Sequence, residues 1–311
     1  MQNTIRVKHL TKDFGNGRGI YDFNFEIQKG QIYGLVGTNG SGKTTTIRHM
    51  MGFLRSDNGY VTINGLDSYK HASKIKQYVG YCPGQIEFPD VRNGKNFLKI
   101  QAQLLGLKDL SYMNELIDRL KIDITAPLRR MSKGMKQKMA LVVAFMAEPD
   151  IYILDEASTG LDPLMRDTLI EIILEQKAKG KTFFMSSHIF KELEDTCDKV
   201  MFIHDGEVVQ VIDRAEYEKA PHELYIYSFA KTEDYKLYQK SEFYKNHPIQ
   251  YPFEESNEKK NQISIYLPSN EIMDLLEELS KYELLSFSNP AITLENYYTN
   301  MIEKTGGIKN D

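Results

Sequence analysis

The chain has 311 residues, a length that favours two domains. Its 39 Lys and Arg residues against 43 Asp and Glu residues give a formal net charge of −4, which argues against a protein held on nucleic acid mainly by counterion release. With 41% hydrophobic and 26% charged residues, the composition is that of a globular protein and excludes a largely disordered one.

Targeting signals and cysteines place further bounds on the class of protein. The longest apolar run, Met139 to Ala147, is well short of the roughly 20 residues that a membrane-spanning helix needs. The N-terminus has no apolar region of the kind that a signal peptide requires. Cys82 and Cys197 are too few and too far apart for a disulfide framework, so we expect two reduced, partly buried thiols in a cytosolic protein.

The first third of the chain alternates strand patterns with turns. Thr4–His9 and Tyr21–Glu26 alternate apolar and polar residues, which predicts half-buried strands. Three more elements are predicted before residue 64: a strand at Gln31–Val36, a helix at Lys43–Phe53 and a strand at Tyr60–Ile63. From Asn93 to about Ala147 the periodicity becomes helical, which indicates a helical insertion.

The pattern after the insertion is typical of a parallel sheet. Ile151–Leu154 and Thr182–Met185 are short apolar runs that suit strands buried on both faces. Helices are predicted at Leu164–Lys179 and Ile189–Cys197, and a closing pair of strands is predicted at Lys199–His204 and Gly206–Ile212.

Beyond about residue 215 the composition shifts towards Tyr, Glu and Lys, which predicts a second, smaller α+β unit. Its expected elements are strands at Leu224–Phe229 and Gln262–Leu267 and helices at Glu271–Tyr282 and Leu294–Lys304. Its Tyr-, Glu- and Lys-rich faces are of the kind that usually form solvated surface.

The segment from Gly37 to Thr44 fits the phosphate-loop pattern G-x-x-x-x-G-K-[ST], with an apolar strand before it and a helix after it. Its glycines permit a tight loop whose backbone N–H groups converge on an anion at the helix N-terminus. Lys43 is predicted to reach the β- and γ-phosphates, and Thr44 to join a Mg²⁺ shell. The predicted nucleotide-binding residues here are Thr38, Asn39, Gly40, Ser41, Gly42, Lys43, Thr44 and Thr45.

Two adjacent carboxylates complete the chemistry that the residues themselves indicate. Asp155 ends an apolar strand, where it would hold Mg²⁺ directly or through water. Glu156 follows it and could act as a base that polarises the attacking water. Each residue alone could be a solvated acid at a strand end, but the phosphate loop upstream favours the functional interpretation.

Three further segments narrow the class of protein. Gln85 follows a strand-like run, and His188 follows a predicted buried strand. Between them, the segment Met131–Lys138 (MSKGMKQK) starts a helix with Ser132 as its predicted N-cap. In this order and spacing, the motifs resemble the nucleotide-binding subunit of ATP-binding cassette (ABC) transporters over residues 1–215. The resemblance implies an α/β fold, a P-loop NTPase of the ABC type with a mixed sheet core and a helical subdomain at about residues 86–148. Residues 216–311 are then expected to form a small C-terminal α+β accessory domain.

The resemblance also implies roles for individual residues. Gln85 would contact Mg²⁺ or the attacking water and sense the membrane partner, and His188 would be the switch histidine on the γ-phosphate. Ser132 and Gly134, in the signature segment Met131–Lys138, would touch the γ-phosphate bound by the opposite subunit. Asp162 would be the key acid of the loop Ser158–Asp162, which resembles the loop that communicates across the dimer and is called the dimer loop below. Phe14 matches the position of the aromatic residue that stacks on adenine; the alternative is an ordinary core aromatic.

The chain departs from the family pattern at two places. Lys133 and Met135 replace Gly and Gln of the usual LSGGQ signature, a form similar to the cassettes of the ABC-2 exporter branch. A Lys in the first turn of a helix is mildly unfavourable unless an anion docks there. Ala157 and Ser158 stand where Pro and Thr are commoner after the glutamate, which leaves both carboxylates in place.

The expected function is therefore that of the ATP-binding and ATP-hydrolysing subunit of an ABC transporter, most simply an ABC-2-type exporter, with ATP and Mg²⁺ as cofactors. One chain carries one set of motifs, so we expect a homodimer or a heterodimer with a second cassette, and no nucleic-acid partner. A separate transmembrane permease is expected to dock around Gln85–Val91, which would hold the protein at the cytoplasmic face of the cell membrane.

Other functions fit less well. The alternative is a soluble ABC-type ATPase, but translation-factor types carry two cassettes in a chain, and chromosome and repair types separate the two phosphate motifs by a long coiled coil. A module that binds ATP without hydrolysing it is opposed by the presence of Glu156 and His188.

Overall fold

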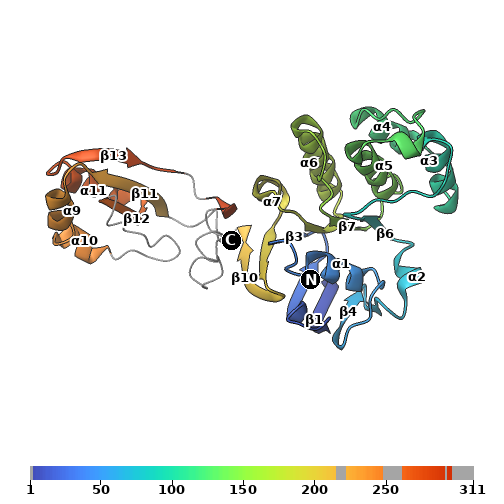
Figure 1. Cartoon of the computed structure of the whole chain (residues 1–311), viewed down its shortest axis with the longest axis horizontal. Coiled ribbons are helices and arrows are strands. Elements are labelled where there is room, and N and C mark those ends of the chain that lie inside the picture. The colour runs from blue at the N-terminus through green and yellow to red at the C-terminus, as the bar shows by residue number, and fades with distance from the viewer. Residues whose placement is uncertain (1–2, 215–221, 248–260, 291–292, 296–311) are drawn as a thin grey trace. The chain divides into compact units, whose positions relative to one another are not determined.

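The computed structural model describes residues 3–214, 222–247, 261–290 and 293–295 (Figure 1). Its contacts divide the chain into two compact units, Met1–Arg214 and Ala215–Asp311. Each unit has a hydrophobic core of its own.

The first unit contains a four-stranded antiparallel sheet with the strand order β2-β1-β4-β5. Its strands are β1 (Asn3–Asp13), β2 (Gly19–Gln28), β4 (Asn58–Ile63) and β5 (Leu66–Asp67). In β2, Phe23, Phe25 and Ile27 are buried while the residues between them are more exposed, so the predicted alternation is confirmed. The buried face contributes to the core that also contains Ile47 and Leu35.

The second sheet has six strands in the order β10-β9-β3-β8-β7-β6, and every neighbouring pair is parallel except β9 and β10. Its strands are β3 (Ile32–Gly37), β6 (Val79–Cys82), β7 (Ile151–Asp155), β8 (Thr182–Ser186), β9 (Lys199–His204) and β10 (Glu207–Asp213). Every residue of β3, β7 and β8 is buried, which the apolar runs of β7 and β8 had predicted for those two strands. The carboxyl ends of β3, β6, β7 and β8 therefore meet at one edge of the sheet.

Four helices of the first unit connect the strands of these sheets: α1 (Lys43–Met50), α2 (Ala72–Ile75), α6 (Pro163–Ala178) and α7 (Phe190–Thr196). The predicted extension of α1 to Phe53 is wrong, because Gly52 takes a left-handed φ of 65° that ends the helix. The Asp162 carboxylate caps α6 by accepting a hydrogen bond from the Met165 backbone N–H at 3.0 Å. Cys82 and Cys197 are both buried and free, as expected.

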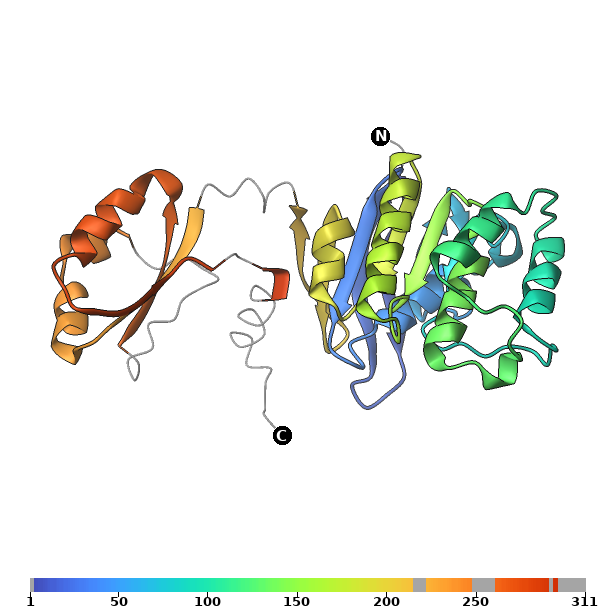
Figure 2. The ribbon, with the colours of Figure 1, turned by 90° about the horizontal axis from the view of Figure 1, so that it is seen from above.

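A group of helices gathers at one end of the first unit in both views (Figures 1 and 2). It comprises α3 (Gly94–Leu104), α4 (Ser111–Arg119), the 3₁₀ turn η1 (Leu128–Arg130) and α5 (Lys133–Phe145), all within the stretch whose periodicity predicted helices. Among the helices of the described residues, none combines the length and the apolarity that crossing a bilayer requires.

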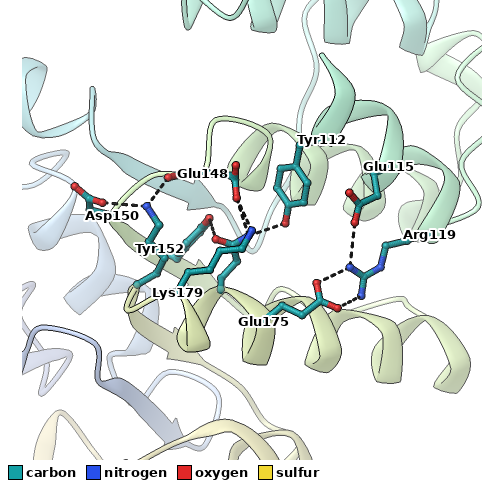
Figure 3. Close-up of polar contacts among 10 residues, drawn as sticks. Tyr112, Glu115, Arg119, Glu148, Asp150, Tyr152, Glu175 and Lys179 are labelled. Atoms are coloured by element: carbon teal, nitrogen blue, oxygen red, sulfur yellow. Dashed lines mark hydrogen bonds and ion pairs between the residues drawn. The ribbon is translucent and has the colours of Figure 1, made fainter. Parts of the chain in front are cut away.

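Helix α4 is joined to α6 by a network of polar side chains (Figure 3). The Arg119 guanidinium donates to both carboxylate oxygens of Glu175, at 2.6 and 2.8 Å. At the next residue of α6, the Gln176 amide donates to the Tyr112 hydroxyl at 2.9 Å and accepts from the Tyr152 hydroxyl at 3.3 Å. Because Arg119 and Tyr112 are both on α4, the network fixes the helical subdomain to the core at two points.

Removing the guanidinium should loosen this junction. We expect Arg119→Ala to lower the free energy of unfolding by about 1 kcal/mol. The loss of a bidentate ion pair is destabilising, but the loss stays small because the Glu175 side chain is half exposed to solvent. The loss should shrink in 1 M salt, which screens exposed charges. Thermal denaturation measures it, with Arg129→Ala as the control, because the pair of Arg129 with Asp90 is exposed on both sides. Equal effects from the two variants would contradict the prediction.

The second unit is built on a three-stranded antiparallel sheet with the order β12-β11-β13. Its elements are β11 (His222–Phe229), α9 (Thr232–Tyr238), α10 (Glu242–Asn246), β12 (Gln262–Pro268), the 3₁₀ turn η3 (Ser269–Glu271), α11 (Ile272–Leu279) and β13 (Leu284–Ser288). The two strands predicted here are present, and the predicted helix at Glu271–Tyr282 is shorter, while α9, α10 and β13 had not been predicted. The helix predicted at Leu294–Lys304 falls almost entirely outside the described residues.

Four tyrosines belong to the buried core of this unit, together with Phe, Ile and Leu side chains, so the expectation of a solvated Tyr-rich face is wrong. Tyr227 and Tyr238 are completely buried, and their hydroxyl groups form a hydrogen bond of 2.5 Å with each other. Tyr235 and Phe229 pack against the same cluster. A phenol can be buried when its hydroxyl finds a partner, and composition alone does not reveal such a pair.

Candidate nucleotide-binding site

The loop between β3 and α1 surrounds the side chain of Lys43. Gly40 and Gly42 have left-handed φ angles of 86° and 110°, which favour glycine, and a Cβ on Gly42 would lie 2.4 Å from the Ile20 side chain. The Lys43 ammonium donates to the carbonyl oxygens of Gly37 at 2.9 Å and Thr38 at 3.2 Å, and only 5% of its side chain is exposed. The loop thus holds a cation at the start of a helix, where backbone N–H groups are free to meet an anion.

The two carboxylates at the end of β7 have different environments. Asp155 is buried and accepts a hydrogen bond from the Ser186 hydroxyl at 2.7 Å. Glu156 has a left-handed φ of 46°, and its N–H donates to the Ser186 carbonyl at 3.0 Å. Non-glycine residues adopt this φ at a cost of about 1 kcal/mol, and such strain is commonest at functional sites.

Glu156 lies between two groups that come from other strands. One carboxylate oxygen is 3.6 Å from the Lys43 ammonium, and the other is 3.8 Å from Nδ1 of His188. Lys43 follows β3 and His188 follows β8, and these strands are hydrogen-bonded neighbours. The parallel sheet therefore brings Lys43 close to Glu156 and His188, which both lie more than a hundred positions later in the chain.

A cavity of about 230 Å³ lies beside the two carboxylates. Its lining includes the exposed Thr44 hydroxyl and the Gln85 amide, and a Cβ on Gly84 would lie 3.3 Å from the Asp155 carboxylate. A hydroxyl, an amide oxygen and a carboxylate are hard oxygen donors, which Mg²⁺ prefers when nucleotide phosphates supply the remaining ligands. The described residues contain no cluster of three or more His, Cys, Asp or Glu side chains that could hold a metal unaided.

Arg48 is a residue of this cavity that sequence reasoning missed. Its exposed side chain lies one turn after Thr44 on α1 and lines the cavity beside Gln85. The i, i+4 spacing from Thr44 could have revealed it, because residues four apart share a helix face.

The remaining predicted residues lie outside this cavity. Ser132 is the N-cap of α5, as predicted, and accepts from the Met135 N–H at 3.2 Å. Gly134 packs against the dimer loop, since a Cβ there would lie 2.4 Å from the Gly160 carbonyl oxygen. Phe14 is 55% exposed and therefore not a core aromatic.

Comparisons with known proteins agree with this arrangement. Residues 20–159 match the family described as ABC transporter. The ABC transporter ATP-binding protein YtrB of Bacillus subtilis (strain 168) is 32% identical over 216 residues, which cover 69% of this chain and 74% of YtrB. The Nod factor export ATP-binding protein I of Ralstonia nicotianae is 30% identical over 226 residues, 71% of this chain and 68% of that protein.

A solved structure, of an ATP binding subunit of an ABC transporter, superposes with a TM-score of 0.62 and 30% identity over 69% of this chain and 93% of that chain. The fold and the site define an ATP-binding cassette of the P-loop NTPase class, which confirms the predicted fold. The chain belongs to the family of ABC transporter ATP-binding proteins.

Proposed function

We propose that this cassette hydrolyses ATP with Glu156 as the general base and drives export through a separate membrane permease. The observation that carries the proposal is the position of the Glu156 carboxylate between the Lys43 ammonium and the His188 ring. Glu156 would accept the proton of the attacking water, Lys43 would bind the β- and γ-phosphates, and His188 would contact the γ-phosphate.

Other residues of the site would hold the metal and the base of the nucleotide. Thr44, Gln85 and Asp155 are the proposed Mg²⁺-binding residues, and Mg²⁺ would neutralise negative charge on the phosphates. The exposed Phe14 is proposed to stack on adenine. The phosphate cradle runs through Thr38, Asn39, Gly40, Ser41, Gly42 and Thr45, and the hydroxyl of Ser41 is buried without a hydrogen-bond partner among the described residues.

Two cassettes are needed to complete a site under this proposal. Ser132 and Gly134, the signature residues assigned to the γ-phosphate, do not line the cavity of their own chain. We therefore propose that they close the site of a second cassette, identical or related, and that Asp162 in the dimer loop lies at that interface. Asp162 already caps α6, so its role would combine helix capping with contact across the dimer.

The permease is proposed to dock in a groove next to the site. This groove has a volume of about 560 Å³ and is lined by Gln85 and four of the residues after it, together with Phe97 and Gln101 of α3. The rings of Phe88 and Phe97 pack together with their centroids 4.7 Å apart, which gives the groove an apolar side. Arg48 and Gln85 line both the groove and the 230 Å³ cavity, so a docked segment would lie close to the reacting phosphate.

The class of relatives supports the proposal of export and of a location at the cytoplasmic face of the membrane. The signature form SKGMKQK is similar to that of ABC-2 exporters, and one relative is named for Nod factor export. The second unit, residues 215–311, is proposed to be an accessory domain, because none of the described site residues lies in it.

Co-purification tests the permease proposal. The tagged protein should bring a multi-span membrane protein out of detergent-solubilised membranes of its source cells. Phe88→Glu places a charge on the apolar side of the groove and should remove that protein without changing the ATP affinity. Leu104→Glu is the matched control, because Leu104 is 75% exposed on α3 and does not line the groove. A complex with ribosomes in place of a membrane protein would favour a soluble ABC-type ATPase.

A further inference from the structure

A second buried carboxylate, that of Glu192 on α7, lies outside the cavity just described. Only 1% of Glu192 is exposed. Burying a charge without compensation is expensive, so the groups that contact this side chain should explain its presence.

Two serine hydroxyls donate to one and the same oxygen of Glu192. Ser158 donates to Oε2 at 2.7 Å, and Ser187 donates to Oε2 at 2.7 Å. The Ser187 hydroxyl in turn accepts the Ile189 N–H at 3.0 Å. All three residues of the bridge, Ser158, Glu192 and Ser187, are buried.

The bridge connects two segments that flank the proposed catalytic base. Ser158 opens the dimer loop, which is anchored to Glu156 by a hydrogen bond of 3.0 Å from the Thr159 N–H to the Glu156 carbonyl. Ser187 directly precedes His188 and donates its N–H to the Leu35 carbonyl of β3 at 3.2 Å. In addition to these backbone contacts, a single oxygen atom of Glu192 joins the start of the dimer loop to the residue before His188.

Stability alone does not favour such a bridge. Replacing buried ionic or polar groups with well-packed apolar side chains of similar volume is often neutral or stabilising. Burial raises the pKa of Glu192, which reflects this cost, although the hydrogen bonds from Ser187 and Ser158 act in the opposite direction. A bridge that costs free energy but fixes geometry is typical of positioning residues around a reaction site.

We propose that Glu192 is a positioning residue for ATP hydrolysis, which holds the dimer loop and His188 in register with Glu156 through Ser158 and Ser187. The proposal rests on the roles given above to Glu156 and His188. Contact of a second cassette with the dimer loop would then be transmitted to His188 inside the chain. The close packing of Gly134 on Gly160 gives the signature helix a contact with the same loop.

Two substitutions of Glu192 separate the loss of the hydrogen-bond acceptor from a change in side-chain size. Because both serines donate to Oε2, Glu192→Gln keeps the oxygen acceptor and should retain kcat within about threefold. Glu192→Leu is similar in size but has no acceptor, and it should lower kcat by about 10- to 100-fold, the scale of a small misplacement of reacting groups. KM for ATP should stay within about twofold for both variants, since no phosphate-loop contact changes.

Two more variants keep the test decisive. Ser158→Ala removes one of the two hydrogen bonds to Glu192 and should also lower kcat. It keeps the proposal testable if Glu192→Leu does not fold. Asp195→Leu is the matched control on the same helix, where the carboxylate pairs with the exposed Lys191. A normal kcat in folded Glu192→Leu or Ser158→Ala would overturn the proposal. If His188→Ala and Glu156→Gln also kept wild-type turnover, the proposed function itself would be wrong.

Discussion

Glu156→Gln should abolish steady-state turnover while leaving ATP binding intact. A positioned general base contributes about 10²- to 10⁴-fold to rate, and an amide cannot take a proton from water. The substitution keeps the size of the side chain, and glutamine accepts the left-handed backbone at this position about as readily as glutamate does. Loss of the carboxylate also removes a negative charge 3.6 Å from the Lys43 ammonium, so the affinity for ATP should not fall.

The same variant should accumulate a dimer with ATP. If ATP joins two cassettes and hydrolysis separates them, then blocking the chemical step leaves the closed state populated. Size-exclusion chromatography with ATP and with ADP measures this, alongside phosphate release. Glu171→Gln is the control, because Glu171 is 68% exposed on α6 and lies outside the cavity. If Glu156→Gln released phosphate at a rate near that of the wild type, the general base would be another residue.

Lys43→Ala should lose ATP affinity. The buried ammonium holds the phosphate loop through the Gly37 and Thr38 carbonyl oxygens, and it supplies the positive charge nearest to Glu156. A hydrogen bond to a charged group is worth about 1.5–3 kcal/mol, which corresponds to about a 10- to 100-fold higher Kd. Titration with a fluorescent ATP analogue measures the change.

A matched control separates this effect from a general loss of charge. Lys231→Ala removes a lysine of the second unit whose partner is the exposed Glu283, and it should leave the Kd unchanged. An unchanged Kd in Lys43→Ala would mean that the phosphates bind elsewhere.

The local motifs could be predicted because their residues are contiguous. The phosphate loop is defined by the spacing of Gly37, Gly42 and Lys43, and the N-cap at Ser132 depends only on the next three residues. The buried strands β7 and β8 likewise followed from unbroken apolar runs.

Features that depend on distant partners could not be predicted. The aromatic core of the second unit relies on the hydrogen bond between Tyr227 and Tyr238, and the composition of that region suggested solvated surface instead. Glu192 occurs in an ordinary amphipathic helix pattern, and its partner Ser158 lies 34 residues earlier. A periodic pattern indicates which face of a helix is buried, but it does not indicate which polar groups of other segments the buried side chains contact.

The sequence by itself thus determined the class of protein and predicted which residues bind the phosphates and carry the acidic groups, because those signals lie in short segments with fixed spacing. Only the tertiary structure decided that the Glu156 carboxylate lies between Lys43 and His188, and that one oxygen of Glu192 joins Ser158 to Ser187, the residue before His188. The physical reason is the parallel sheet, which brings the carboxyl ends of β3, β7 and β8 to one edge whatever their separation along the chain.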